Sequence, residues 1–387
     1  MREVGTEDIV SILEYFKDLE DPRSSVNQKH LLGDLIVISM LAVISGADGP
    51  QAIGLWARSY DKWLTEHLEL PGGIPSHDTI GRLLASLKPA AFQNCFQRWI
   101  RSLRGGDLDE TKIQAQEIVA IDGKALRRSH NRHKGLGPLF LVSAWSVQRG
   151  ISLGQLATAE KSNEITAIPE LLEQIDVRNA VVTIDAAGCQ KSIATKIIDG
   201  GADYVLALKG NQGTLHQAVE DHILAQLEDD FQEVEVQQCE EVVKGHGRLD
   251  TLTYYQLPVP ETLTKRDCWK GLTTIGLAVR LSERAGQETC EFRYYISSLD
   301  MGVTQFARAV RGHWGIENTL HWCLDVTFRE DDSRVRDRHA AENLAWLKRL
   351  AISVLKQHQD KNSIAMRRRM AGWNIDYLAQ VLGISHT

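Results

Sequence analysis

The chain has 387 residues, of which 43% are hydrophobic and 25% are charged, and its formal net charge is −7. This length predicts two or three domains rather than one small core, and the composition is that of an ordinary soluble protein. The six cysteines lie far apart and form no CxxC pair, which argues against a zinc ribbon or a disulfide framework and fits a reducing cytosol. The acidic charge balance, taken alone, argues against a nucleic-acid partner, because such proteins are usually basic.

The first part of the chain, residues 6–105, is predicted to be helical. Its most apolar run starts at Leu31 and continues for about 15 residues, short of the ~20 that a membrane span needs, so we expect a core helix. Acids at Glu7 and Asp8 argue against a signal peptide. Ser76 is an expected helix N-cap. The helices around it fit a DNA-reading helix-turn-helix or, more commonly, a plain helical bundle.

Strands and helices alternate after residue 117. In chain order we expect a strand at 117–122, a hairpin that turns at Gly150, a helix at 164–175, a strand at 180–185, a helix at about 190–200 and a strand from 203. This order is typical of a mixed sheet with helices packed on it. Farther on we expect an acidic helix at 214–230, strands between 233 and 298, helices at about 303–325 and 337–357, and a basic tail from 361.

Two apolar strands end in the same way, each with an aspartate followed by a small residue. Asp122 follows "EIVAI" and Asp185 follows "VVTI". Functional groups gather where strands leave the core of such a sheet, and two carboxylates that lie close together repel unless a proton or a cation intervenes. Oxygen ligands of this kind suit Mg²⁺ or Mn²⁺. The alternative, which is about as common, is that each aspartate caps the loop that follows it.

A third carboxylate comes from the predicted helix at 303–325. At 100° per residue, Phe306, Val310 and Leu324 fall on the same face as Glu317. Glu317 is therefore predicted at the centre of the apolar stripe, where a carboxylate is costly unless it is paired or bound to a metal. An ion pair with Arg311 is one alternative. A zinc site formed by His313, Glu317 and His321 is another, although the HExxH spacing is absent.

Two basic runs stand out against the acidic whole. Residues 124–134, "KALRRSHNRHK", hold five Lys or Arg, two His and no acid, and Arg367–Arg369 form a second run. Such runs are most often solvated surface. They point to a polyanion only when they lie beside a catalytic site.

The three carboxylates, in this order, resemble the DDE triad of RNase H-like transposases. More closely, the chain resembles the IS4-type enzymes and, among these, the ISAs1 family with its H-repeat-associated proteins linked to Rhs elements. The matching stretches include "AIDGKALR", "EKSNEITAIPELL", "TIDAAGCQK", "YVLALKGNQ", "KGHGR", "RYYISS" and "HWGIENTLHWCLDVTFREDDSRVR". The N-terminal "DPR" and "GIPSHDTI" resemble the helical domain that precedes the catalytic core in this family.

The resemblance implies an α/β fold with an RNase H-like mixed sheet flanked by helices. It implies an N-terminal helical, transposase-associated domain at 1–106, a catalytic core at 112–212 and 290–360, a β-rich insertion at 213–289 and a basic C-terminal tail at 361–387. The implied activity is metal-dependent DNA cleavage and strand transfer in the cytoplasm, on the nucleoid. Asp122, Asp185 and Glu317 would hold two Mg²⁺ or Mn²⁺ ions, and the enzyme would act as a homodimer on transposon ends and target DNA, with no membrane partner.

Basic and polar residues near the triad then become candidates for DNA binding. They are Lys124, Arg127, Arg128, Lys209, Lys244, His246, Arg248, Arg311, His313 and Asn318. The last three could replace part of the IS4 signature Y-x2-R-x3-E-x6-K, because its Tyr, Arg and Lys positions hold Val310, His313 and Leu324 here. Lys209 could instead form a structural ion pair. A metal-dependent nuclease that does not join DNA, and a DNA-binding remnant without catalysis, remain alternative functions.

Overall fold

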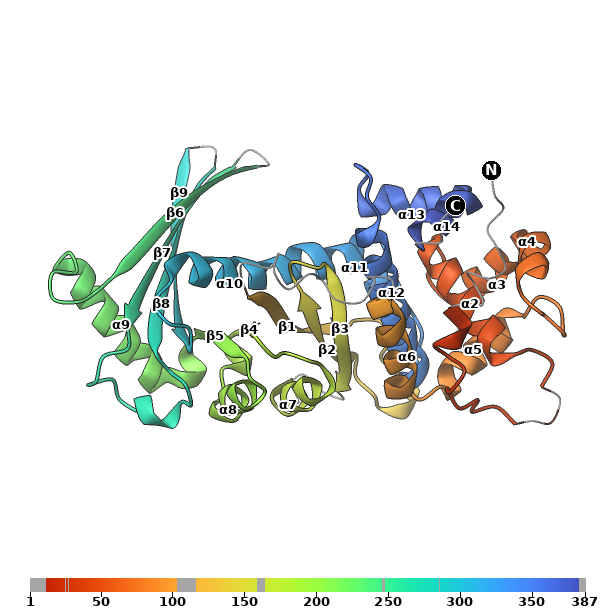
Figure 1. Ribbon diagram of the computed structural model, residues 1–387, viewed down its shortest axis with the longest axis horizontal. Helices are drawn as coiled ribbons and strands as arrows, with labels where there is room; N and C mark the ends of the chain where they lie inside the picture. Colours follow the sequence, from red (N-terminus) through yellow and green to blue (C-terminus); the bar gives the residue numbers. More distant parts are fainter. Residues whose placement is uncertain are drawn as a thin grey trace.

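The computed structural model describes residues 12–24, 26, 28–102, 116–158, 164–245, 248–284 and 286–382. The molecule is elongated, with a helical end, a central sheet and long strands at the opposite end (Figure 1). None of the helices in these ranges combines the length and apolar character that crossing a membrane requires.

The helical end joins the first and last helices of the chain around one apolar core. Helix α2 is buried along nearly its whole length, which confirms the predicted core helix. The Ser76 hydroxyl accepts a hydrogen bond from the Thr79 N–H at 3.2 Å, as its predicted cap role requires. The helices are α2 (Leu32–Ile44), α3 (Pro50–Ser59), α4 (Asp61–His67), α5 (His77–Ser86), α6 (Pro89–Ser102) and α12 (Arg338–Gln357).

Helix α5, the candidate for reading DNA in a helix-turn-helix, is held inside this bundle. It packs against α3 and α12, and its apolar residues Ile80, Leu83 and Leu84 are buried. These contacts favour the plain-bundle interpretation of the N-terminal region.

Nine strands form one sheet, in the order β3-β2-β1-β4-β5-β9-β8-β7-β6. Strands β1, β4 and β5 run parallel to one another, and every other neighbouring pair is antiparallel. The strands are β1 (Glu117–Leu126), β2 (Leu139–Ser146), β3 (Ile151–Thr158), β4 (Ala180–Ile184), β5 (Asp203–Leu208), β6 (Gln237–Gly245), β7 (Arg248–Pro258), β8 (Thr274–Arg284) and β9 (Gln287–Ser297).

Helices cover both faces of the sheet (Figure 1). One face packs on α7 (Glu164–Gln174), α8 (Lys191–Asp199) and α9 (Gly213–Glu228). The opposite face packs on α10 (Val303–Gly315), which contacts β1 and β4. This layered mixed α/β arrangement is the one expected from the order of the predicted elements.

The strand-rich segment after α9 continues the central sheet. Strand β9 pairs antiparallel with β5, with Val205 opposite Ser297, and β8, β7 and β6 follow outward. The far ends of these strands extend beyond α10 (Figure 1). The domain boundaries predicted above remain predictions, and the first of them lies at residues outside the described ranges.

The basic C-terminal segment is helical, with α13 (Ile364–Trp373) and α14 (Ile375–Val381). Arg367 and Arg368 are buried, so they do not form the solvated surface expected of a basic run. Arg368 donates to the Val43 and Ala47 carbonyls and pairs with Asp48 at 2.8 Å. Arg368 therefore joins the two ends of the chain, Arg367 bonds to Asp360 and the Leu355 carbonyl, and Arg369 alone stays exposed.

Candidate active site

Asp122 lies inside β1, not at its end as the sequence predicted. The strand continues to Leu126 because β2 remains its antiparallel partner as far as the Leu126–Leu139 pair. On the other side, the parallel pairing with β4 ends at Ile121 opposite Ile184. Asp122 and Asp185 therefore each follow the last paired residue of β1 and β4, so they are neighbours, as predicted. They are neighbours because the pairing of β1 with β4 ends there, not because both strands end there.

The pleat of the sheet sets which face Asp122 lies on. Ile121 and Ile184 belong to the core under α7 and α8. Because side chains alternate along a strand, Asp122 points to the opposite face, the one covered by α10 and its continuation. Its Oδ1 accepts the Gly123 N–H at 2.8 Å, and its Oδ2 lies 3.4 Å from His321 Nδ1.

Asp185 caps the turn that follows β4. Its Oδ1 accepts the N–H groups of Ala187 and Gly188 at 3.0 and 3.2 Å. These contacts match the capping alternative, yet both use the same oxygen. No described residue forms a hydrogen bond with Oδ2, so the exposed carboxylate retains a free coordinating atom.

Glu317 lies in a π-helical segment, Ile316–His321 (labelled η7), between α10 and α11 (Trp322–Val326). The side chain is exposed, so the prediction that it occupies the centre of a buried stripe is wrong. The wider π-turn shifts the stripe: the buried positions after Val310 are Gly312, Ile316, Leu320, Cys323 and Leu324. Single π-turns of this kind occur frequently at functional sites. Here the π-helix packs on β1 and leaves the Glu317 carboxylate at the surface beside it.

The electrostatics of Asp122 connect the three carboxylates. Burial, together with the negative charges of Asp185, Glu317 and Glu164, raises the pKa of Asp122 to about 7 and outweighs the Gly123 N–H, which lowers it. A carboxyl that feels three other carboxylates is a recognised mark of a functional site. The three predicted residues are thus brought within electrostatic reach of one another.

Glu164 is a fourth carboxylate that the sequence analysis did not single out. It is the first residue of α7, and its carboxylate lies so close to Gly123 that a Cβ at Gly123 would collide with it. A glutamate at the N-terminus of a helix is usually explained by its favourable interaction with the helix dipole. The sequence therefore gave no separate indication that Glu164 lies near the other acids. It approaches from the α7 face of the sheet, opposite to the face toward which Asp122 points, and its negative charge contributes to the raised pKa of Asp122.

The two histidines of the zinc alternative face different partners. His313 Nδ1 lies 3.3 Å from the Thr183 hydroxyl, whereas His321 lies against Asp122. Burial lowers the pKa of His313 to about 4, and burial with the charges of Arg349 and Lys124 lowers that of His321 to about 3. Within the described part of the chain, no group of three His, Cys, Asp or Glu side chains is placed to hold a metal ion. The geometry therefore gives no support to the zinc alternative.

The Lys124 ammonium group forms ion pairs with acidic side chains. Its Nζ lies 2.7 Å from Asp325, 3.2 Å from Asp331 and 3.4 Å from Glu330, and its side chain is only 9% exposed. Burial alone would raise the pKa of Glu330, but the charges of Arg349 and Lys124 outweigh burial and lower it. In this state Lys124 joins β1 to the segment after Glu317 and is not available to a phosphate.

The remaining basic candidates divide into paired and unpaired groups. Arg127 pairs with Asp331, Arg128 with Asp332, Arg248 with Asp250, and Arg311 with Glu241. Lys209, after β5, and Lys244, in β6, are exposed. Asn318 donates to the Trp314 carbonyl at 3.2 Å. His246 lies outside the described residues.

Comparison with known proteins now adds the family. Residues 101–354 match the family model described as "Transposase DDE domain", and residues 13–100 match the model described as "DDE_Tnp_1-associated". The chain is 38% identical to the "Putative transposase YncI" of Escherichia coli O157:H7, over 97% of this chain and 95% of that protein. It is 36% identical to the "H repeat-associated putative transposase YhhI" of Escherichia coli strain K-12, over 97% of this chain and 98% of the relative. A shorter relative, "Inactive transposase YbfQ", is 30% identical over 21% of this chain.

Proposed function

Because the chain belongs to the family of transposases with a DDE domain, we propose that it is the transposase of an insertion sequence of the ISAs1 type. It cleaves DNA strands at the ends of the element and transfers them to a target. Asp122, Asp185 and Glu317 are its catalytic triad. The enzyme acts on cytoplasmic, nucleoid-associated DNA, and two copies of the chain hold the two ends of the element.

The observation that carries this proposal is the geometry of the acids: Asp122 and Asp185 directly follow the paired residues Ile121 and Ile184, and the π-helix of Glu317 packs on β1. Burial, together with the charges of Asp185 and Glu317, raises the pKa of Asp122 accordingly. Three elements far apart in sequence supply these carboxylates: a mid-strand position, a strand end and a π-helix. Such convergence is expected of a site whose acids act together. We further propose that β1 to β5 form an RNase H-like core. A three-stranded antiparallel unit, β3-β2-β1, joined to the parallel strands β4 and β5 supports this.

The donor set at the site fits divalent cations. All three acidic groups offer oxygen, which Mg²⁺ and Mn²⁺ prefer, and their mutual repulsion is the kind that a cation relieves. Mg²⁺ is usually held by one or two carboxylates, with water and substrate phosphates completing its shell. Asp122, Asp185 and Glu317 are the residues that would hold such ions.

When bound, two such cations would activate the attacking oxygen and stabilise the leaving oxygen. The protein contributes rigid placement, since Asp122 is fixed by its pairing with Ser143 of β2 and Asp185 by two backbone N–H groups. Asp122 can also hold a proton near neutral pH, which keeps the empty site from accumulating charge. His321, kept neutral by burial, contacts the Asp122 carboxylate without adding charge.

The test is Glu317→Gln, measured for cleavage, strand transfer, DNA binding and melting. We expect cleavage and transfer to fall by several orders of magnitude, because a charged ligand is removed while its shape is kept. Melting and DNA binding should match wild type, because Glu317 is exposed. Glu228→Gln, which alters an exposed acid at the end of α9, serves as the matched control and should stay active.

Three results would contradict the proposal. Full activity of Glu317→Gln would remove Glu317 from the triad. Cleavage without joining of pre-cut ends would identify a nuclease. A wild-type protein that binds element ends but never cuts them, with either Mg²⁺ or Mn²⁺, would identify a remnant without catalysis.

A further inference from the structure

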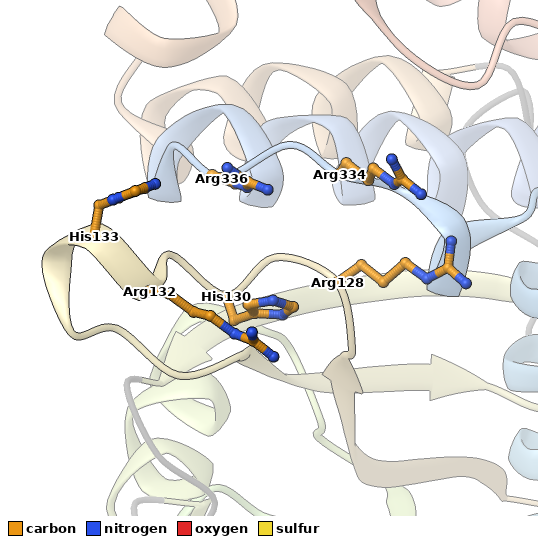
Figure 2. A pocket seen from close by; sticks show the side chains of 6 residues that line it. All are labelled: Arg128, His130, Arg132, His133, Arg334 and Arg336. Carbon is orange, nitrogen blue, oxygen red and sulfur yellow. The ribbon is translucent and has the colours of Figure 1, made fainter.

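A basic cavity lies beside the turn that follows β1, a few residues after Asp122 in the chain. Its volume is about 390 Å³ and its lining contains no acid. Figure 2 shows that the lining side chains belong to two facing segments, which are the turn after β1 and the extended stretch before α12. The lining residues are Arg128, His130, Arg132, His133, Arg334 and Arg336.

The turn that forms one wall is built by local hydrogen bonds. The Ser129 hydroxyl donates to the Leu126 carbonyl and accepts the Leu139 N–H, at 2.7 and 2.8 Å. The Asn131 side chain caps the short helical turn at Arg132–Lys134, and Gly135 closes it with a φ of +66°. This wall is therefore an ordered structure, not a loose basic loop.

The opposite wall is tied to the first by charged contacts outside the cavity mouth. Arg127 and Lys124 pair with Asp331, and the Arg338 guanidinium donates to the Gly137 carbonyl at 2.9 Å. Val335 packs on the apolar core while its neighbours Arg334 and Arg336 are exposed. These two side chains therefore project together from an extended segment, as residues two apart do.

The arginines that line the cavity form few ion pairs or hydrogen bonds. Arg128 pairs with Asp332 at 3.5 Å. No ion pair or hydrogen bond with another described residue involves the guanidinium groups of Arg132, Arg334 or Arg336. Like charges gathered around one cavity repel one another, and a bound anion relieves that repulsion. Arginine in addition matches phosphate oxygens with two parallel donors.

We propose that this cavity binds phosphodiester groups of the DNA backbone, as a second contact point for the duplex that the carboxylate site cuts. The proposal rests on the proposed function and extends it to residues outside the triad. Six residues separate Asp122 from Arg128, a reach of at most about 20 Å at 3.3 Å per residue. That distance corresponds to about six base pairs at 3.4 Å each, so one duplex can occupy both places.

The decisive experiment compares Arg334→Gln/Arg336→Gln with Arg178→Gln/Lys270→Gln. The control removes two exposed charges near the start of β4 and the start of β8, away from the end of the sheet where Asp185 lies. The probe is a 30-base-pair duplex of random sequence, a length chosen as about five times the proposed reach. Its binding is measured without divalent metal at several salt concentrations.

We expect the slope of log K against log salt to flatten by about 0.9 for each lost phosphate contact, so by 1 to 2 units for the test variant. Binding at 0.1 M salt should weaken by about eight-fold for each contact, and far less in the control. Melting should not change, since both arginines are exposed. Arg334→Lys/Arg336→Lys keeps the charge and should retain most of the slope.

The inference would be overturned by an unchanged salt dependence of DNA binding, or by a loss of DNA affinity equal to that of the control. So would a cavity that takes only a small anion: inorganic pyrophosphate would then stabilise wild type, but not Arg334→Gln/Arg336→Gln, with no difference in DNA binding. These results are independent of catalysis. A protein that cuts DNA with an unaltered slope loses only this inference, and one that shows the slope change but never cuts loses only the proposed activity.

Discussion

At the scale of single residues, Asp122 links the chemistry of the site to the stability of the fold. Its pKa is raised to about 7 in the folded state, against 3.8 for an ordinary aspartate. Between these values the folded protein keeps a proton that the unfolded chain has lost. The free energy of unfolding therefore falls as pH rises from about 4 to 7, by up to about 1.4 kcal/mol per unit, and levels off above.

Asp122→Asn removes this contribution because an amide binds no proton in this range. Relative to wild type, the variant should gain stability steadily from pH 5 to pH 7 and no more above pH 8, as measured by urea unfolding without metal. A constant difference across the range would mean that burial and the neighbouring acids do not raise the pKa of Asp122, and the electrostatic argument for the site would fail.

The sequence predicted three acids that the structure brings within electrostatic reach of one another, but not how they are presented. The shared "Ile-Asp-small" endings point to Asp122 and Asp185, and the helical periodicity points to Glu317; the resemblance points to all three. The exposure of Glu317 could not be predicted, because a regular helix was assumed and the π-turn depends on packing against β1. Glu164 was missed for a related reason: its closeness to Gly123 depends on how α7 lies on the sheet.

At the scale of elements, Lys124 holds the segment after Glu317 against β1. Replacing it with Met would leave buried Glu330, which is 2% exposed, with one fewer counter-charge, would remove the Lys124 partner of Asp325 and would leave Asp331 with Arg127 alone. We expect Lys124→Met to lose about 3–5 kcal/mol of stability, as when a buried pair is broken. Arg127→Gln, which breaks an exposed contact with Asp331, should cost at most about 1 kcal/mol. Urea unfolding of both variants makes the comparison.

The opposite pattern would assign Lys124 to DNA. If Lys124→Met folds as stably as wild type but loses DNA affinity, then the acidic contacts exchange for phosphate in the working enzyme. The prediction from sequence that Lys124 binds phosphate would then hold. Contacts other than those of Lys124 would have to hold β1 against the segment after Glu317.

Element order was predictable from apolar periodicity, and element ends were not. The strand that begins at Glu117 was predicted to stop at Asp122, where the apolar run ends, yet it continues because a partner strand is present. Likewise Arg367 and Arg368 form part of a basic run in sequence but are buried, since carbonyls near Val43 and Leu355 accept their hydrogen bonds. Only the tertiary structure reveals partners so distant in the chain.

At the scale of the whole molecule, a single sheet connects the strands that carry Asp122 and Asp185 to the long outer strands. The pairing of β5 with β9 makes this connection, and no local pattern in the sequence could indicate it. The carboxylates lie on the face covered by α10 and the π-helix. The basic cavity lies farther along β1 and its turn. A duplex that crosses this face could therefore contact the carboxylates and the cavity together.

The central claim is that the carboxylates hold divalent cations, and a melting experiment with Mn²⁺ at pH 8 tests it most directly. Binding to the folded state alone at 100 times the dissociation constant adds about 2.7 kcal/mol, which corresponds to a rise of about 3 °C for a chain of 387 residues that unfolds as a whole. We expect millimolar Mn²⁺ to raise the melting temperature of wild type and to leave Asp122→Asn/Asp185→Asn unchanged. An equal rise in the double variant would show that the metal binds elsewhere and would contradict the account.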